Sequence, residues 1–166
     1  MNRRSYKATF LFLALAVTFV LLRMFVVHTV RIQGSSMDNT LRDGEIALVT
    51  GFDYRFGGKP ERGDIVECAF PNRSGTYVKR VIGLPGEFIE IRNGKTYIDG
   101  EYFAENYVNS RAEDYAVTLG EGEYFVLGDN RAESYDSRSA DMGLLKKENF
   151  LGRVRMVLSP LREINS

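Results

Sequence analysis

Residues 30–49 read VRIQGSSMDNTLRDGEIALV, and this stretch predicts a sharp bend between two short strands. The alternation at 30–33 and the apolar run at 46–49 are typical of strands, whereas the Gly, Ser, Asp and Asn residues between them are typical of turns. Ser35 and Ser36 stand in this bend. A serine in a tight turn can expose its Oγ beside a free backbone N–H, and a hydrolytic nucleophile needs both features. Serine-rich turns are commonly only structural, so the stretch alone leaves both interpretations open.

The rest of the chain beyond the N-terminus repeats this pattern of short alternating runs separated by Gly, Asn, Asp or Pro. Asn93-Gly94 is a hairpin turn signal, residues 144–150 predict one short helix, residues 52–61 an exposed loop, and residues 102–122 a polar surface excursion. We therefore predict a mainly β fold, a compact antiparallel domain of many short strands without repeats. The predicted strands are residues 45–50, 64–70, 76–83, 87–92, 95–99, 124–127 and 151–159.

The N-terminus has the composition of a membrane anchor. Residues 1–7 are basic, and residues 8–27 are apolar apart from two threonines and Arg23, which can extend to the interface from its place near one end. A helix of this length spans about 30 Å, the thickness of a bilayer core. A cleavable signal peptide is the alternative, but bulky residues follow Leu22 where a small-x-small site would be required. We predict a cytoplasmic tail (1–7), one transmembrane helix (8–27) and an extracytoplasmic β domain (28–166) at the cell membrane.

The charge distribution argues against nucleic acid as a partner. The 166 residues include 22 basic and 22 acidic ones, and four of the basic residues but none of the acidic ones precede His28. This leaves 18 basic against 22 acidic residues from His28 onward, a net charge of −4, whereas nucleic-acid binders are usually basic. One cysteine, Cys68, excludes an intramolecular disulfide, and one histidine is too few for most metal sites and is badly placed for a Ser-His-Asp triad.

Two further stretches carry candidate chemistry. In a strand over residues 76–83, Lys79 shares a face with Tyr77 and Val81. A lysine on a solvated face is the commoner case, whereas an apolar setting would lower its pKa and provide a neutral amine as a base. The polar loop at 128–138 follows an apolar strand and can brace neighbouring loops, for example by pairing Asp136 with Arg138.

Four motifs in this order, behind an apolar N-terminal segment, resemble type I signal peptidase, a membrane-bound Ser-Lys protease. They are GSSMDNTL at 34–41, RGDIV at 62–66, YVKRVIGLPGE at 77–87 and GDNRAESYDSR at 128–138. The resemblance covers most of the chain and implies a serine endopeptidase. It assigns Ser36 as nucleophile, Lys79 as general base, Ser134 as the residue that orients the lysine, Asp136 and Arg138 as a bracing ion pair, and Asp129 as partner of Arg80.

The resemblance also implies a substrate class. Substrates are signal peptides of exported preproteins with small residues one and three positions before the cut, and the matching wall residues are Ile32, Met37, Tyr77 and Val78. No metal or cofactor is implied, and the short chain resembles the compact bacterial members that lack a large inserted second β domain.

The chain departs from the family pattern at two places. Asn39 stands where members often have proline, and Gly34 stands where some have a serine that completes the oxyanion hole. Three other interpretations remain open: a cytoplasmic self-cleaving repressor-type Ser-Lys enzyme, a membrane-tethered β module without activity, and a Cys68 nucleophile, for which a small buried side chain is the alternative.

Overall fold

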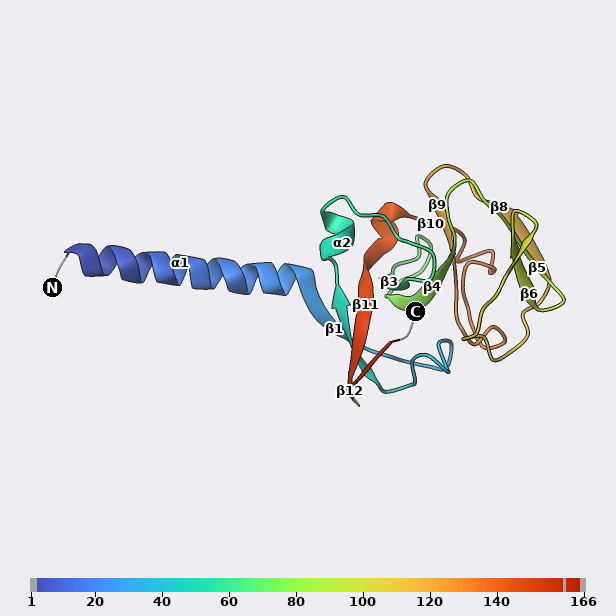
Figure 1. The fold of residues 1–166 in the computed structure, drawn as a ribbon, viewed down its shortest axis with the longest axis horizontal. Helices are drawn as coiled ribbons and strands as arrows, with labels where there is room; N and C mark the ends of the chain where they lie inside the picture. The colour runs from blue at the N-terminus through green and yellow to red at the C-terminus, as the bar shows by residue number, and fades with distance from the viewer. Residues whose placement is uncertain (1–2, 160, 165–166) are drawn as a thin grey trace.

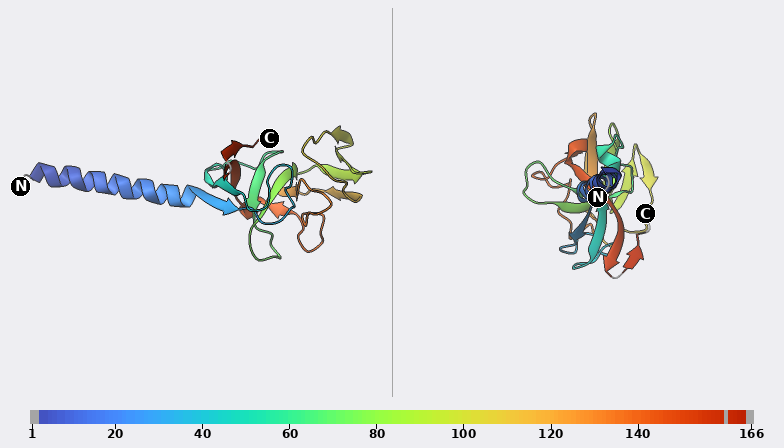
Figure 2. Two further views of the ribbon diagram at one scale, coloured as in Figure 1. Left: turned by 90° about the horizontal axis from the view of Figure 1, so that it is seen from below. Right: turned by 90° about the vertical axis from the view of Figure 1, so that its left-hand side faces the viewer.

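The computed structural model describes residues 3–159 and 161–164, without the side chains of residues 3–5, 21–26, 53 and 161–163. A long helix leads into a β domain, and Figures 1 and 2 show that this helix extends away from the strands. The elements are α1 (Arg3–Val26), β1 (Val27–Arg31), β2 (Ile46–Thr50), α2 (Phe52–Arg55), β3 (Ile65–Cys68), β4 (Tyr77–Gly83), β5 (Phe88–Arg92), β6 (Lys95–Ile98), β7 (Glu101–Phe103), β8 (Tyr115–Thr118), β9 (Glu123–Leu127), β10 (Leu145–Lys146), the 3-10 turn η1 (Lys147–Asn149), β11 (Phe150–Ser159) and β12 (Leu161–Glu163).

Helix α1 is continuous with β1 and exposes apolar side chains, among them Phe10 and Phe12, which are 77% and 73% exposed. Within the described part of the chain, none of the helices combines the length and apolar character that crossing a bilayer requires. The predicted anchor at 8–27 includes Arg23 and the other side chains of 21–26, which lie outside the described residues, as do residues 1–2 of the predicted tail.

The main sheet carries the candidate site. Its strand order is β1-β2-β11-β3-β4-β9-β10, with β12 added to β11, and every strand pair between described residues is antiparallel, as predicted. Apolar residues on its two faces form separate cores. One contains Val66, Cys68 and Val81, and the other contains Ile32, Met37, Ala47, Val49 and Ile65; we call the latter the β1-side core.

A second, four-stranded sheet (β7-β6-β5-β8) lies at the end of the domain opposite α1 (Figure 1). The predicted surface excursion at 102–122 is therefore wrong in part, because it contains β8 and buries Leu119. The two sheets meet at Gly83, where an added Cβ would come within 3 Å of Leu119, Ile89 and Phe125 (2.6, 2.9 and 2.9 Å). The predicted compact antiparallel domain thus consists of two sheets that share a core.

Two shorter predictions also differ from the structure. The expected helix at 144–150 is a two-residue strand followed by one 3-10 turn, since Leu145 pairs with Tyr124 of β9 and leaves only Lys147–Asn149 to turn. The expected exposed loop at 52–61 begins with the short helix α2, because Tyr54 is buried and its hydroxyl donates a hydrogen bond to Asp64 at 2.9 Å.

Candidate active site

Ser36 lies in a tight turn that follows β1. The turn starts at Gly34, whose φ of 84° is a left-handed conformation that glycine adopts without strain. Backbone hydrogen bonds close it, from Asp38 N–H to the Ser35 carbonyl at 3.0 Å and from Leu41 N–H to the Met37 carbonyl at 2.8 Å. Met37 is 1% exposed and fixes the turn to the β1-side core, so Ser36 is half-buried beside β4.

Lys79 reaches Ser36 from the middle of β4. Its Nζ lies 2.7 Å from the Ser36 Oγ, and the lysine is only 3% exposed. Val66 stands opposite Lys79 on β3. Burial lowers the pKa of Lys79 from its usual 10.5, because removing an ammonium from water penalises the charged form; Asp136 acts in the opposite direction. A neutral amine next to a serine hydroxyl is the arrangement of a base and a nucleophile.

Arg80, the next residue on β4, forms a fully buried ion pair with Asp129. Its Nε and Nη2 donate to the two carboxylate oxygens at 2.9 and 2.7 Å, and both side chains are 0% exposed. Nη1 donates to the Gly63 carbonyl at 3.0 Å, and Nη2 also meets the Thr40 hydroxyl at 3.3 Å. Since these partners come from all four sequence motifs, we call this set (Thr40, Gly63, Arg80 and Asp129) the Arg80 network.

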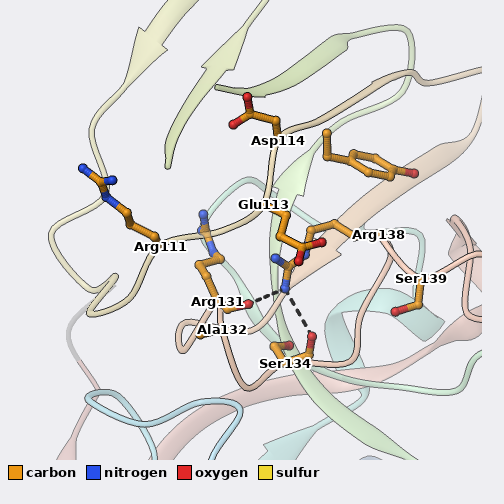
Figure 3. Close-up of a pocket in the computed structure, with 9 residues that line it drawn as sticks. Arg111, Glu113, Asp114, Arg131, Ala132, Ser134, Arg138 and Ser139 are labelled. Carbon is orange, nitrogen blue, oxygen red and sulfur yellow. Dashed lines mark hydrogen bonds between the residues drawn. The ribbon is translucent and has the colours of Figure 1, made fainter. Parts of the chain in front are cut away.

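The loop after β9 places a second ion pair near the lysine. Arg138 Nε and Nη2 donate to Asp136 at 2.8 and 2.9 Å, and Nη2 also donates to the carbonyls of Arg131 and Ser134 at 2.8 and 3.2 Å (Figure 3). Asp136 accepts a further hydrogen bond from the Gly128 N–H at 3.1 Å. The structure therefore brings Asp136 and Arg138 together, and Arg138 in turn holds the loop closed.

Ser134 lies close to the nucleophile turn but is not hydrogen-bonded to the lysine. Its Oγ accepts from the Gly128 N–H at 3.1 Å, and among the described residues no hydrogen bond links it to Lys79. An added Cβ on Gly128 would overlap both the Ser134 hydroxyl and the Ser36 carbonyl, so glycine permits their close approach. The orienting role of Ser134 stays a prediction. On its other side, Ser134 borders a polar cavity of about 460 Å³ (Figure 3).

Asn130 is a functional candidate that reasoning from the sequence missed. Its backbone N–H donates to the Ser36 carbonyl at 3.1 Å, and its Nδ2 donates to the Ser35 carbonyl at 3.2 Å. The Ser110 hydroxyl donates to its Oδ1 at 2.9 Å and so fixes the orientation of the amide. Asn130 therefore attaches the nucleophile turn to the loop after β9; its place beside Asp129 in the fourth motif was the available signal.

Of the four predicted wall residues, the structure groups three. Ile32 and Met37 belong to the β1-side core, and Val78 packs against it. Tyr77 points to the other face of β4, where it packs edge-on against Phe70 with ring centres 5.4 Å apart. Successive residues of a strand alternate between faces, so Tyr77 shares a face with Lys79 rather than with Val78.

The structure shows the backbone conformation at Asn39 and the hydrogen bonding of Gly34, the two residues that depart from the family pattern. Asn39 has a φ of 83°, a region that asparagine tolerates and that proline, fixed near −65°, cannot enter. The Gly34 N–H donates to Asp43 at 2.8 Å and is therefore already engaged. Among the described residues, the N–H groups of Ser35 and Ser36 donate no hydrogen bond and remain available to an oxyanion.

A metal site and a cysteine nucleophile have less support from the described residues. Over the part of the chain that the structure describes, no three His, Cys, Asp or Glu side chains are grouped so as to hold a metal ion. The buried Cys68 thiol lies 3.5 Å from the Tyr77 carbonyl, and burial raises its pKa to about 12, so that it stays protonated and is a poor nucleophile.

Comparison with known proteins identifies the family of the chain. The family model described as "Signal peptidase, peptidase S26" matches residues 3–159. The chain is 38% identical to a signal peptidase I of Bacillus licheniformis, over 87% of this chain and 83% of that protein, and 35% identical to signal peptidase IB of Staphylococcus aureus strain Mu50, over 91% and 89%. The crystal structure of a signal peptidase I from Enterococcus faecalis V583 matches with a TM-score of 0.52 and 36% identity, covering 57% of this chain and 96% of that one. The chain therefore belongs to the type I signal peptidases of peptidase family S26, and it is a serine peptidase.

Proposed function

We propose that the chain cleaves signal peptides from exported preproteins with Ser36 as nucleophile and Lys79 as general base. The observation that carries this proposal is the 2.7 Å contact between Lys79 Nζ and Ser36 Oγ at a lysine that is 3% exposed. Family membership supports the substrate class, since several relatives carry the name signal peptidase I.

The chemical steps follow from this geometry. Neutral Lys79 takes the proton of Ser36 as Oγ attacks the scissile carbonyl, and the Ser36 N–H, with that of Ser35, binds the developing oxyanion. Lys79 then gives its proton to the leaving amine, and an ester to Ser36 remains. Water that loses its proton to Lys79 attacks this ester and releases the signal peptide. Asp136, Arg138, Asp129 and Arg80 hold the surrounding loops and take no proton.

The substrate binds as an added strand in this proposal. In the described chain β1 pairs only with β2, which leaves its other edge free for an extended peptide. Side chains of the peptide alternate, so those one and three positions before the cut both face the β1-side core, next to Ile32, Met37 and Val78.

We also propose that residues 8–27 anchor the protein in the bilayer, with the tail at 1–7 in the cytoplasm and the β domain at 28–166 outside. The support is the 20-residue apolar run, its basic flank and the projection of α1 away from the strands. An anchor places the enzyme and the apolar part of its substrate in the same membrane, which raises their effective concentration.

Cleavage of a preprotein by the full chain in detergent tests the catalytic proposal. Ser36→Ala and Lys79→Arg should each abolish product, because guanidinium stays protonated and cannot act as the base, while exposed Lys59→Arg should cleave as the parent does. A folded Lys79→Arg variant that cleaves at near the parental rate would refute the Ser-Lys mechanism.

The topology is tested by labelling whole cells with an impermeant thiol reagent. Lys59→Cys, in the exposed segment after α2, should react from outside, and buried Cys68 of the parent should give little background. Labelling that appears only after the cells are lysed would reverse the proposed orientation.

A further inference from the structure

A buried carboxylate lies on the same face of the sheet as the proposed substrate positions. Glu67 of β3 stands opposite Val78 of β4 in the register, so the two side chains share a face. That face is the one covered by the β1-side core, which includes the neighbouring inward residue of β3, Ile65. The Glu67 side chain is 7% exposed, an uncommon setting for an acidic residue.

His28 is the partner of this carboxylate. On β1, His28 stands opposite Val49 of β2, and Val30 stands opposite Ala47. Both β2 residues are buried in the β1-side core, so the two β1 side chains point toward that core as well. The His28 Nε2 lies 2.5 Å from Glu67 Oε2, and the His28 side chain is 43% exposed. The only histidine in the sequence thus extends from the edge strand to the only acidic side chain buried beside Val78 among the described residues.

The Glu67 carboxylate has unused hydrogen-bonding capacity. A carboxylate can accept about four hydrogen bonds, whereas His28 supplies one, and the described residues offer no second donor to the Glu67 side chain. A peptide added along β1 would cover this group and exclude water from it. Its free lone pairs then either receive a donor from the peptide or remain unsatisfied, which is costly.

We propose that Glu67, held by His28, is a specificity residue for the substrate side chain three positions before the cut, and that it favours a small hydroxyl over an apolar side chain of the same shape. This inference rests on the proposed function. In a strand that adds to β1 with its cut site at Ser36, the side chain one position before the cut lies beside Ile32 and Met37. The side chain three positions before it lies beside Val30 and Val78, next to the carboxylate. A serine or threonine hydroxyl can donate to Glu67 there, whereas valine cannot.

Threonine and valine have nearly the same shape, so their comparison isolates the hydroxyl. The full chain in detergent should be assayed on preproteins that differ only at this position. We expect a kcat/KM for threonine about tenfold above that for valine, from one hydrogen bond to a charged group less the desolvation of the hydroxyl. Glu67→Val should bring the ratio to one or below, and Glu67→Gln, which keeps a neutral acceptor, should give an intermediate ratio.

Two controls separate specificity from structure. Glu101→Val on β7 of the second sheet likewise replaces a strand glutamate by valine, but Glu101 is exposed and lies outside the β1-side core, so this variant should keep the parental ratio. The same threonine–valine exchange two positions before the cut, where the side chain points away from the core, should give a ratio near one in every variant. If Glu67 only braced β1 against β3, its variants would melt earlier and lose activity equally on both substrates.

The outcomes are distinguishable. A parent that cleaves the threonine and valine preproteins, with a threonine-to-valine ratio that Glu67→Val and Glu67→Gln leave unchanged, would overturn this inference and leave the proposed function intact. A parent that cleaves none of the preproteins would overturn both. If Glu67→Val does not fold, the isosteric Glu67→Gln decides, because an unchanged ratio in that variant would also overturn the proposal.

Discussion

The Arg80 network should be the most sensitive point of the fold outside the apolar cores. Asp129→Asn keeps the shape of the side chain and removes its charge, so the guanidinium of Arg80 loses its counter-ion at a site where both groups are 0% exposed. Arg80 cannot release its proton, and the stacked ring of Tyr107, 3.8 Å from the guanidinium, offers only weak compensation. Removing one partner of a buried pair costs about 3–5 kcal/mol.

That cost is a large fraction of the stability of a single domain. Domains are typically stable by about 5–15 kcal/mol, and a domain of this size loses roughly 3 °C in melting temperature per kcal/mol. Asp129→Asn should therefore melt roughly 10–15 °C below the parent. Circular dichroism in one detergent, with parent and variant side by side, measures the shift.

The exposed pair between Arg73 and Asp141 provides the matched control. Its side chains are 44% and 48% exposed, so Asp141→Asn should leave the melting temperature nearly unchanged, because water screens the charges. The double variant Arg80→Met, Asp129→Leu should recover much of the loss, since no buried charge remains. A melting temperature of Asp129→Asn within about 3 °C of the parent would refute the idea that this network holds the motifs together.

Four further predictions concern the site itself. Lys79→Met should raise the melting temperature at neutral pH, because it removes a buried group whose charged form is destabilised by folding. The rise in melting temperature should be largest below the lowered pKa of Lys79 in the folded state, and it should vanish as pH approaches 10.5, where the lysine is neutral in both states. Arg138→Ala should raise the pKa of Lys79 and move the rise of kcat/KM to higher pH, because Arg138 no longer offsets Asp136; an unmoved profile would contradict this. Asn130→Asp should lower kcat more than it raises KM, since the Ser35 carbonyl loses its side-chain donor; equal changes in both would assign Asn130 to binding. Asn39→Pro should melt well below Asn39→Gly, as measured by circular dichroism, because glycine accepts the φ of 83° and proline, fixed near −65°, cannot.

The strands of the main sheet were predictable because their signals are local. The predicted strand at 76–83 is β4 at Tyr77–Gly83, and the hairpin predicted at Asn93-Gly94 joins β5 to β6, with φ of 53° and 73° at its two turn residues. A type I′ turn requires positive φ at both positions, and Asn-Gly meets that requirement without information from the rest of the chain.

The second sheet was not predictable in the same way. Strand β8 alternates between half-buried and exposed residues, and its identity as a strand depends on pairing with β5, for example Ile89 with Val117. The polar region around it, residues 102–122, contributes only Ala112 before the strand and Leu119 after it to the buried apolar residues. Long-range pairing therefore decides this region, and local composition favoured a loop.

In the candidate site, too, the local features were predictable from the sequence and the long-range contacts were not. The motifs place a serine in a turn and a lysine on a strand, but 43 positions separate Ser36 from Lys79, and only the folded sheet brings their side chains to 2.7 Å. The fourth motif marks Asn130, but its contacts with the nucleophile turn reach across 94 and 95 positions, so the motif alone could not predict these contacts. Reasoning from residue type proposed the groups that react, and the structure shows which groups surround them.

The electrostatic surroundings of Lys79 explain how a lysine near two carboxylates still has a lowered pKa. Asp129 and Asp136 both favour the ammonium form, and alone they would hold the proton on the amine. Each of them is bonded through both oxygens to an arginine, Arg80 and Arg138, so the lysine faces two nearly neutral pairs instead of two free charges. Desolvation by the strands on either side then outweighs the remaining attraction. The two ion pairs therefore do more than brace loops: by occupying the carboxylates, they leave burial to set the pKa of Lys79.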